Sequence, residues 1–118
     1  MKAIDVTIVG GGMITHDLLL PCVYHLQRLG MVGKIAICAL NSAPLKALKE
    51  SQDLRMAFPN QDFVAHPSFD ETGDFPELYK AVIAGMPVRN AVVVAMPDPL
   101  HYPVILEALQ HDQHVLCV

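Results

Sequence analysis

Three consecutive glycines follow an apolar run at residues 4–9 and precede a helical pattern. A glycine loop between a strand and a helix lets the backbone approach a phosphate group closely, and the N-terminus of the helix attracts negative charge. We therefore expect this junction to bind the pyrophosphate of a dinucleotide. The candidate residues are Gly10, Gly11, Gly12, Met13 and Ile14.

The glycine spacing matches only part of the dinucleotide fingerprint GxGxxG, because Gly10 and Gly12 are followed by Thr15 at the third position. Threonine is small, but the third glycine normally allows close packing of helix on strand. The alternative is a glycine-rich turn that starts a helix and binds nothing. A nucleotide-triphosphate loop does not fit the run from Gly30 to Lys34, which lacks the spacing and the following Ser or Thr.

A second group of candidates follows the next predicted strand, which ends in Asn41 and Ser42. An acid at this place normally accepts hydrogen bonds from the adenosine ribose, and here it is missing. Asn41 and Ser42 can bond to the ribose hydroxyls or to a 2′-phosphate, so both NAD and NADP remain open as cofactors. Capping of the next helix is an equally good interpretation of the same two residues.

The third group lies in the loop after the most apolar strand, and its members are Met96, Pro97, Asp98 and His101. A loop at the carboxyl end of a central strand opens onto the crevice where ligands of such sheets bind. His101 is a candidate contact near the cofactor or substrate. The alternative is a polar cap at the surface.

Periodicity predicts that strands and helices alternate along the whole chain, which is typical of a doubly wound α/β parallel sheet, the Rossmann fold. Right-handed crossovers then give the strand order 3-2-1-4-5. Pro21 should kink or shorten the first helix. The predicted strands are 4–9, 34–40, 63–66, 91–96 and 114–118, and the predicted helices are 14–29, one from Asn41 or Ser42 to about Met56, 76–84 and 100–110.

Composition fits one compact domain, residues 1–118, with 53% hydrophobic and 17% charged residues. The net charge of −4, without a run of lysine or arginine, argues against a nucleic-acid or anionic-membrane surface and favours a small-molecule ligand. The apolar runs are shorter than the ~18 residues that span a bilayer, and the N-terminus does not resemble a secretory signal. We expect a cytoplasmic protein that does not enter membranes.

Neither the cysteines nor the histidines have the spacing of a metal site. Cys22, Cys38 and Cys117 lack CxxC spacing, so each is interpreted as a small buried hydrophobic residue rather than as part of a disulfide or zinc site. Most histidines outside the loop at His101 are expected to be surface residues or hydrogen-bonded polar groups. We therefore expect no bound metal.

Taken together, these segments resemble the amino-terminal domain of the glucose-fructose oxidoreductase, inositol dehydrogenase and MocA family. The resemblance implies a bound NAD or NADP and the oxidation or reduction of a sugar, polyol or related substrate. It also matches the loop from Met96 to His101 to the family's threonine-proline-asparagine-x-x-histidine loop beside the nicotinamide, from which Met96 and Asp98 depart. The segments that carry the resemblance are 6–14, 91–101, 107–109 and 114–117.

The family continues after its last strand with a glutamate-lysine-proline motif and a second, substrate-binding domain. Val118 stands where that glutamate would be, so we expect the chain to be a cofactor domain of a longer enzyme, or a shortened relative, without catalytic residues of its own. The alternative is a non-catalytic module that senses a nucleotide or pairs with another subunit. The apolar surface around the fifth strand predicts self-association into a homo-oligomer.

Overall fold

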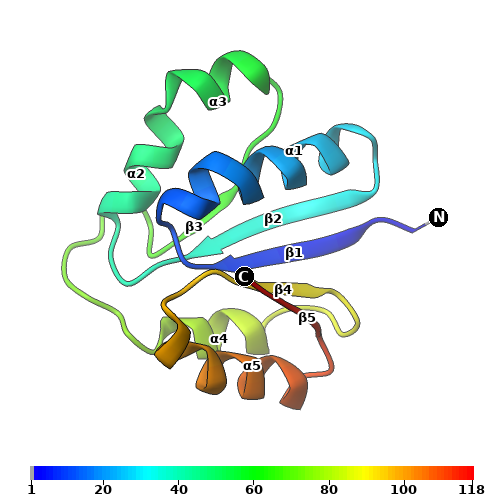
Figure 1. The fold of residues 1–118 in the computed structure, drawn as a ribbon, viewed down its shortest axis with the longest axis vertical. Coiled ribbons are helices and arrows are strands. Elements are labelled where there is room, and N and C mark those ends of the chain that lie inside the picture. The colour runs from blue at the N-terminus through cyan, green and yellow to red at the C-terminus, as the bar shows by residue number, and fades with distance from the viewer. Residues whose placement is uncertain (1) are drawn as a thin grey trace.

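The computed structural model describes residues 2–118, which form a five-stranded parallel sheet with helices on both faces (Figure 1). The strand order β3-β2-β1-β4-β5 confirms the predicted doubly wound fold. The strands are β1 (Ile4–Val9), β2 (Val32–Cys38), β3 (Val64–His66), β4 (Ala91–Val94) and β5 (His114–Cys117). The helical segments are η1 (Thr15–Leu19), α1 (Leu20–Arg28), α2 (Ala43–Glu50), α3 (Gln52–Ala57), α4 (Leu78–Ala84), η2 (Asp98–Leu100) and α5 (His101–Gln110).

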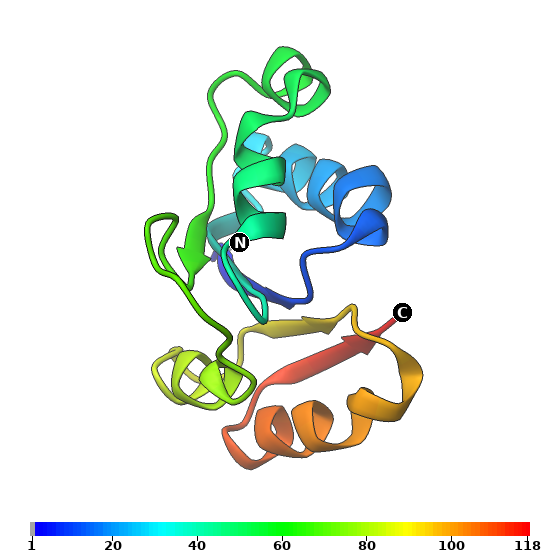
Figure 2. The same cartoon turned by 90° about the vertical axis from the view of Figure 1, so that its left-hand side faces the viewer.

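The central strands are buried on both faces because alternate side chains pack into different helical layers. Val6 and Ile8 of β1 belong to the cluster under α1, α2 and α3, whereas Val9 joins the cluster under α4 and α5. Val92 and Val94 of β4 point toward α4 and α5 as well. Figure 2 shows these helical layers on opposite sides of the sheet.

Two strands are shorter at their carboxyl ends than their apolar runs predict. The run 34–40 forms a strand only as far as Cys38, and the run 91–96 only as far as Val94. One further backbone hydrogen bond follows the last ladder pair in each run. Ala39 N donates to His66 O at 2.9 Å, and Ala95 N donates to Val9 O at 2.9 Å. The neighbouring strands end here, so the apolar residues that follow belong to the loops at the sheet's edge.

The first helix is continuous over residues 13–28 but contains a π-turn at Thr15–Leu19 before α1. The N–H of Leu20 donates to Thr15 O, one residue further back than in an α-helix. Pro21, at the start of α1, has no N–H to donate into the preceding turn, so the widened turn accommodates the proline without breaking the helix. The predicted kink or shortening is therefore replaced by a local change of helix type.

The predicted single helix up to Met56 is wrong, because the chain forms two helices that meet at Ser51. Ser51 has an extended backbone, and its Oγ accepts a hydrogen bond from Leu54 N at 3.4 Å, which caps α3. The change of direction buries Leu54 and leaves Met56 at the surface. A serine followed by an acid in the first turn was the signal for a new helix start.

The interpretation of all three cysteines as buried is also wrong, because only Cys38 is buried, whereas Cys22 and Cys117 are exposed. Cys22 occupies an outward position of α1, and Cys117 lies on the edge strand β5. Among residues 2–118, no helix is long and apolar enough to cross a membrane. The same residues contain no cluster of His, Cys, Asp and Glu side chains with the geometry of a metal site.

Candidate functional site

The loop after β1 lies between the carboxyl ends of β2 and β4. Gly10 N donates to Cys38 O at 2.8 Å on one side, and a Cβ at Gly10 would lie 2.1 Å from Ala95 O on the other. The φ angle of Gly10 is +125°, a conformation that residues with side chains rarely adopt. The fold itself therefore requires glycine at this position.

The other two glycines of the loop have different surroundings. A Cβ at Gly11 would lie 3.2 Å from Pro44 Cβ of α2, so that glycine permits close packing of the loop on the helix. A Cβ at Gly12 would meet no heavy atom of the described chain within 4 Å, its immediate neighbours aside. Packing does not explain glycine at position 12, and the space in front of it is open.

Thr15, which replaces the third glycine of the fingerprint, holds the loop from within. Its side chain is fully buried, and its Oγ1 donates to Gly10 O at 2.8 Å. A hydrogen bond between helix and loop thus stabilises the close approach that glycine provides elsewhere. From the sequence, Thr15 was interpreted only as the position where the third glycine is missing. Its hydroxyl, five residues after Gly10, was the signal for a hydrogen bond between helix and loop.

Met13 and Ile14 begin the helix, and both side chains are exposed. The first N–H groups of a helix have no acceptor within it, so these residues offer backbone donors rather than side-chain contacts. A hollow of about 250 Å³ opens beside them, between the glycine loop and α2. Its lining residues are Gly11, Gly12, Met13, His16, Pro44, Ala47 and Leu48.

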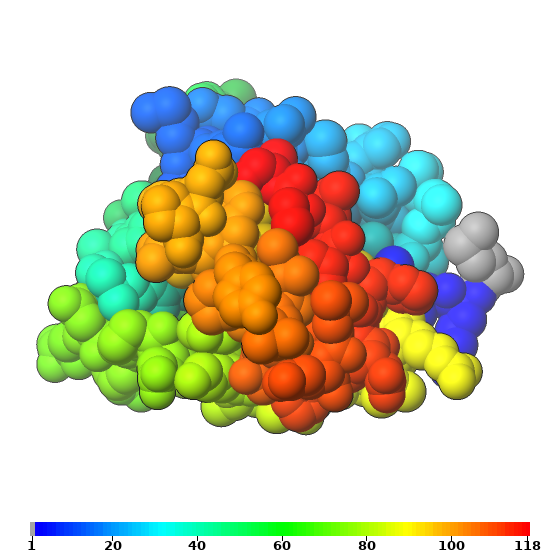
Figure 3. Space-filling model, turned by 60° about the horizontal axis from the view of Figure 1, so that its bottom comes forward, coloured from blue at the N-terminus to red at the C-terminus, as the bar shows by residue number. Residues whose placement is uncertain are grey.

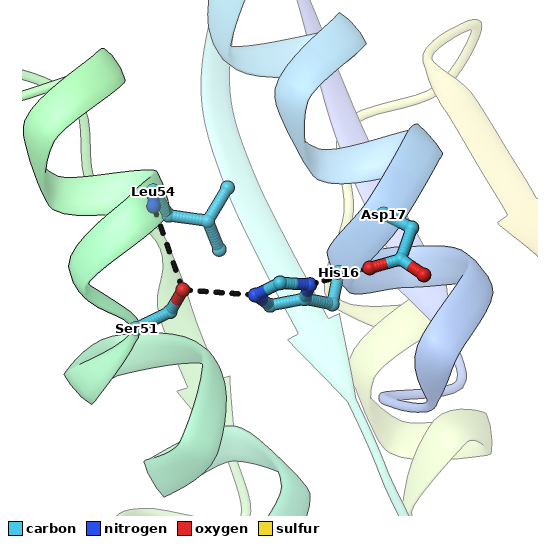
Figure 4. A network of polar contacts seen from close by, with 4 residues as sticks. All are labelled: His16, Asp17, Ser51 and Leu54. Carbon is cyan, nitrogen blue, oxygen red and sulfur yellow. Dashed lines mark hydrogen bonds and ion pairs between the residues drawn. The ribbon is translucent and has the colours of Figure 1, made fainter.

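His16 connects the helix after the glycine loop to the junction of α2 and α3 (Figure 4). Its Nε2 is hydrogen-bonded with Ser51 Oγ at 2.8 Å, and its Nδ1 with Asp17 Oδ1 at 2.7 Å. Ser51 Oγ also accepts from Leu54 N, so a single hydroxyl serves both as the cap of α3 and as the partner of His16. The expectation that His16 is a hydrogen-bonded polar group agrees with these contacts.

The side chains of Asn41 and Ser42, which follow β2, both make hydrogen bonds within the chain. Asn41 Oδ1 accepts from Ala43 N at 3.2 Å, which caps the start of α2, while its Nδ2 donates to Asp74 Oδ1 at 3.2 Å. Ser42 is buried, makes no side-chain cap, and donates from Oγ to Glu71 O at 2.9 Å. Capping therefore belongs to Asn41. Asp74 and Glu71, from the segment between β3 and α4, are thereby held beside the residues that follow β2.

Burial keeps the last side chains of β2 and β3, the Cys38 thiol and the His66 imidazole, uncharged. Burial raises the pKa of the Cys38 thiol to about 11, and desolvation lowers the pKa of His66 below its ordinary value. Both side chains are consequently neutral at pH 7. Neither the last residue of β2 nor that of β3 supplies a charge to a ligand at the strand ends.

The loop after β4 folds back on itself. His101, the first residue of α5, turns its Nε2 toward Met96 O at 2.6 Å, and the same nitrogen lies 3.8 Å from Asp98 Oδ1. The His101 side chain is 16% exposed, whereas that of Asp98 is 95% exposed. Pro97 leads into η2 at Asp98. His101 thus stabilises the loop after β4 by its contact with Met96, and it is not a cap at the open surface. The loop approaches Gly10 through Ala95.

A larger hollow, of about 900 Å³, lies away from the strand ends. Its walls come from Tyr24, from α2 and α3, and from the segment between α3 and β3. A 3.0 Å ion pair joins Lys49 of α2 to Asp62 of that segment. None of the sequence-predicted site residues lines this hollow. The glycine loop, the end of β2 and the loop after β4 instead meet at the carboxyl edge of the sheet.

Comparison with known proteins agrees with this fold. A crystal structure of an oxidoreductase from Thermotoga maritima matches with a TM-score of 0.60 and 22% sequence identity, over 98% of this chain and 29% of that chain. At that identity the match supports the fold. A comparison with curated protein sequences gave no match. Residues 4–117 match the Gfo/Idh/MocA family, described as an oxidoreductase family with an NAD-binding Rossmann fold. This chain therefore belongs to the Gfo/Idh/MocA oxidoreductases, whose Rossmann domain binds NAD(P).

Proposed function

We propose that this chain is the dinucleotide-binding domain of an oxidoreductase that acts on a sugar, a polyol or a related CH–OH substrate. The family supports the redox chemistry, and the bound NAD or NADP would accept or supply the hydride. The chain spans 29% of the Thermotoga protein, so the activity of the whole protein is part of the proposal.

The observation that carries the proposal is the open space at Gly12. Packing does not require glycine at position 12. The residue also lacks the positive φ angle that requires glycine at position 10. A pyrophosphate against this backbone explains the residue, because a side chain would occupy the space of the phosphate. The free N–H groups at the start of the helix, in the turn of Met13 and Ile14, then donate to the phosphate oxygens.

The remaining candidates are assigned to the two ends of the dinucleotide. We place Asn41 and Ser42 at the adenosine ribose, because both lie at the carboxyl end of β2. The nicotinamide end is assigned to the loop after β4, which approaches Gly10 through Ala95. Its candidate residues are Met96, Pro97, Asp98 and His101.

Calorimetric titration with oxidised and reduced NAD and NADP tests the proposal, and Gly12→Val provides the variant. We expect saturable binding by the wild-type chain and at least about a tenfold weaker affinity in the variant, because the valine side chain excludes the phosphate. The melting temperature should stay within a few degrees of wild type, because an added Cβ at position 12 meets open space. Unchanged affinity in a folded variant would mean that this loop is not the phosphate site.

We further propose that the chain alone binds the dinucleotide without turnover. In the loop after β4, His101 Nε2 is hydrogen-bonded with Met96 O and lies 3.8 Å from the almost fully exposed Asp98 carboxylate, so the described loop holds no close pair of an acid and a base. Polyols and sugars should give no reduction of NAD or NADP by the chain, followed by absorbance. Measurable turnover would contradict this part of the proposal.

A homo-oligomer is also proposed, with β5 as the associating element. Among residues 2–118, β5 pairs with β4 alone, so its outer edge keeps unpaired backbone groups. Leu116 and Val118, at this edge, are half-exposed apolar residues.

A further inference from the structure

The segment between β3 and α4 is fastened to the chain that leaves β2. Figure 1 shows this segment passing the end of β2 on its way to α4. The bonds run from Phe75 N to Leu40 O (2.7 Å), from Asn41 Nδ2 to Asp74 Oδ1 (3.2 Å) and from Ser42 Oγ to Glu71 O (2.9 Å). Main-chain and side-chain contacts thus hold the Asp74 carboxylate beside Asn41.

This is the place where a Rossmann domain receives the adenosine ribose, and where an acid at the end of the second strand accepts hydrogen bonds from the ribose hydroxyls. The residues that follow Cys38 here contain no acid as far as Glu50. Asp74 brings a carboxylate to the same place from a different part of the chain. Asn41 occupies one of its oxygens, and a carboxylate has acceptor sites left for a diol.

The charges around Asp74 distinguish the two dinucleotides. Four carboxylates lie between positions 70 and 77, and the cation that follows them, Lys80, is paired with Glu77 at 3.2 Å. A 2′-phosphate would bring its negative charge against Asp74 at short range. Lys46, one turn into α2, is the first cation after β2, and it is exposed, as Asp74 is. The balance favours a ribose that carries only hydroxyls.

We propose that Asp74 is the specificity-determining residue of the cofactor site, accepting hydrogen bonds from the ribose diol of NAD and repelling the 2′-phosphate of NADP. The inference rests on the proposed function, because it assumes that a dinucleotide lies along the carboxyl edge of the sheet. It adds the preference for NAD and the residue that sets it.

The test measures the affinities of the 118-residue chain for NAD⁺ and NADP⁺ by calorimetry, in wild type, Asp74→Asn and Asp70→Asn. We expect wild type to prefer NAD⁺, and Asp74→Asn to shift the affinity ratio toward NADP⁺ by about tenfold or more. Asparagine can still accept from Asn41 Nδ2, so the loop should stay in place. Asp70→Asn removes the same charge from the same segment without touching the bonds to β2, and it should leave the ratio within about twofold.

The outcomes separate the two proposals. A wild-type preference for NADP⁺, an unchanged ratio in Asp74→Asn, or equal shifts in both variants would overturn the role of Asp74 and leave dinucleotide binding intact. Binding of neither NAD⁺ nor NADP⁺ by the wild-type chain would overturn the proposed function, and this inference with it. Thermal melts of both variants confirm that the comparison is made between folded proteins.

Discussion

Gly10, Gly12 and Thr15 occupy the three positions of one fingerprint for three different physical reasons. The backbone of Gly10 has a positive φ and touches Ala95, Gly12 faces open space, and Thr15 hydrogen-bonds the loop to the helix. Substitution at these positions should therefore separate stability from binding, although all three belong to the same motif.

Gly10→Ala should lower the free energy of unfolding by at least about 2 kcal/mol, because the methyl group adds a clash with Ala95 O to an unfavourable φ. Gly12→Ala, the matched substitution, should change it by less than about 0.5 kcal/mol, since its methyl group meets open space. Urea denaturation followed by circular dichroism measures both. Equal losses in the two variants would contradict the distinction.

Thr15→Val should cost about 1–3 kcal/mol of unfolding free energy, because it leaves the Gly10 carbonyl without its hydroxyl donor in a site of the same shape. It should also weaken dinucleotide binding, since the loop is held less firmly. Thr15→Ser, which keeps the hydroxyl, should retain most of the affinity. A Thr15→Val chain that binds as well as wild type would show that this bond does not preorganise the loop.

At the scale of elements, the junction of α2 and α3 positions one wall of the hollow beside the glycine loop. The chain turns at Ser51, whose hydroxyl both caps α3 and meets His16 from the first helix. The wall contributed by Pro44, Ala47 and Leu48 of α2 thus depends on a contact between helices that are not consecutive in the chain.

Ser51→Ala should lower the free energy of unfolding by about 0.5–2 kcal/mol through the loss of the α3 cap. It should also release His16, seen as a change in the chemical shifts of its ring in nuclear magnetic resonance spectra. The control is Ser68→Ala, an exposed serine outside the helices, which should change stability by less than about 0.5 kcal/mol. Unperturbed His16 resonances in Ser51→Ala would contradict the proposed connection.

At the scale of the whole molecule, the edge strand β5 is less well covered by helices than the central strands are. Figure 3 shows β5 and α5, in red and orange, at the surface of the molecule. Val115 packs toward α4 and α5, whereas Leu116, next along the strand, points to the opposite face and is 58% exposed. An apolar residue on an open edge strand is typical of a surface that pairs with another chain.

We expect the chain to self-associate at high concentration, as measured by sedimentation velocity. Leu116→Lys should shift the equilibrium toward monomer, because a charged residue at an edge strand opposes pairing between chains. Leu109→Lys on α5 is the matched control: an exposed apolar residue replaced away from the strand edge. A wild-type chain that remains monomeric over the whole concentration range would rule out this association.

The pattern of residues along the chain by itself determined the class of fold, the order of its elements and the loops that carry the candidate site. Apolar periodicity is a local property, and right-handed crossovers convert it into one strand order. The same local signals mark Gly10 to Ile14 and the loop from Met96 to His101 as candidate site residues in the sequence alone.

Only the tertiary structure decided the contacts that join distant parts of the chain. The hydrogen bonds of Asp74 to Asn41 and of His16 to Ser51 each span more than thirty positions. The exposure of Cys22 and Cys117 depends on which faces the helices cover. Such pairings leave no periodic signal, because nothing about an acid or a hydroxyl in one loop specifies its partner in another until the sheet has brought them together.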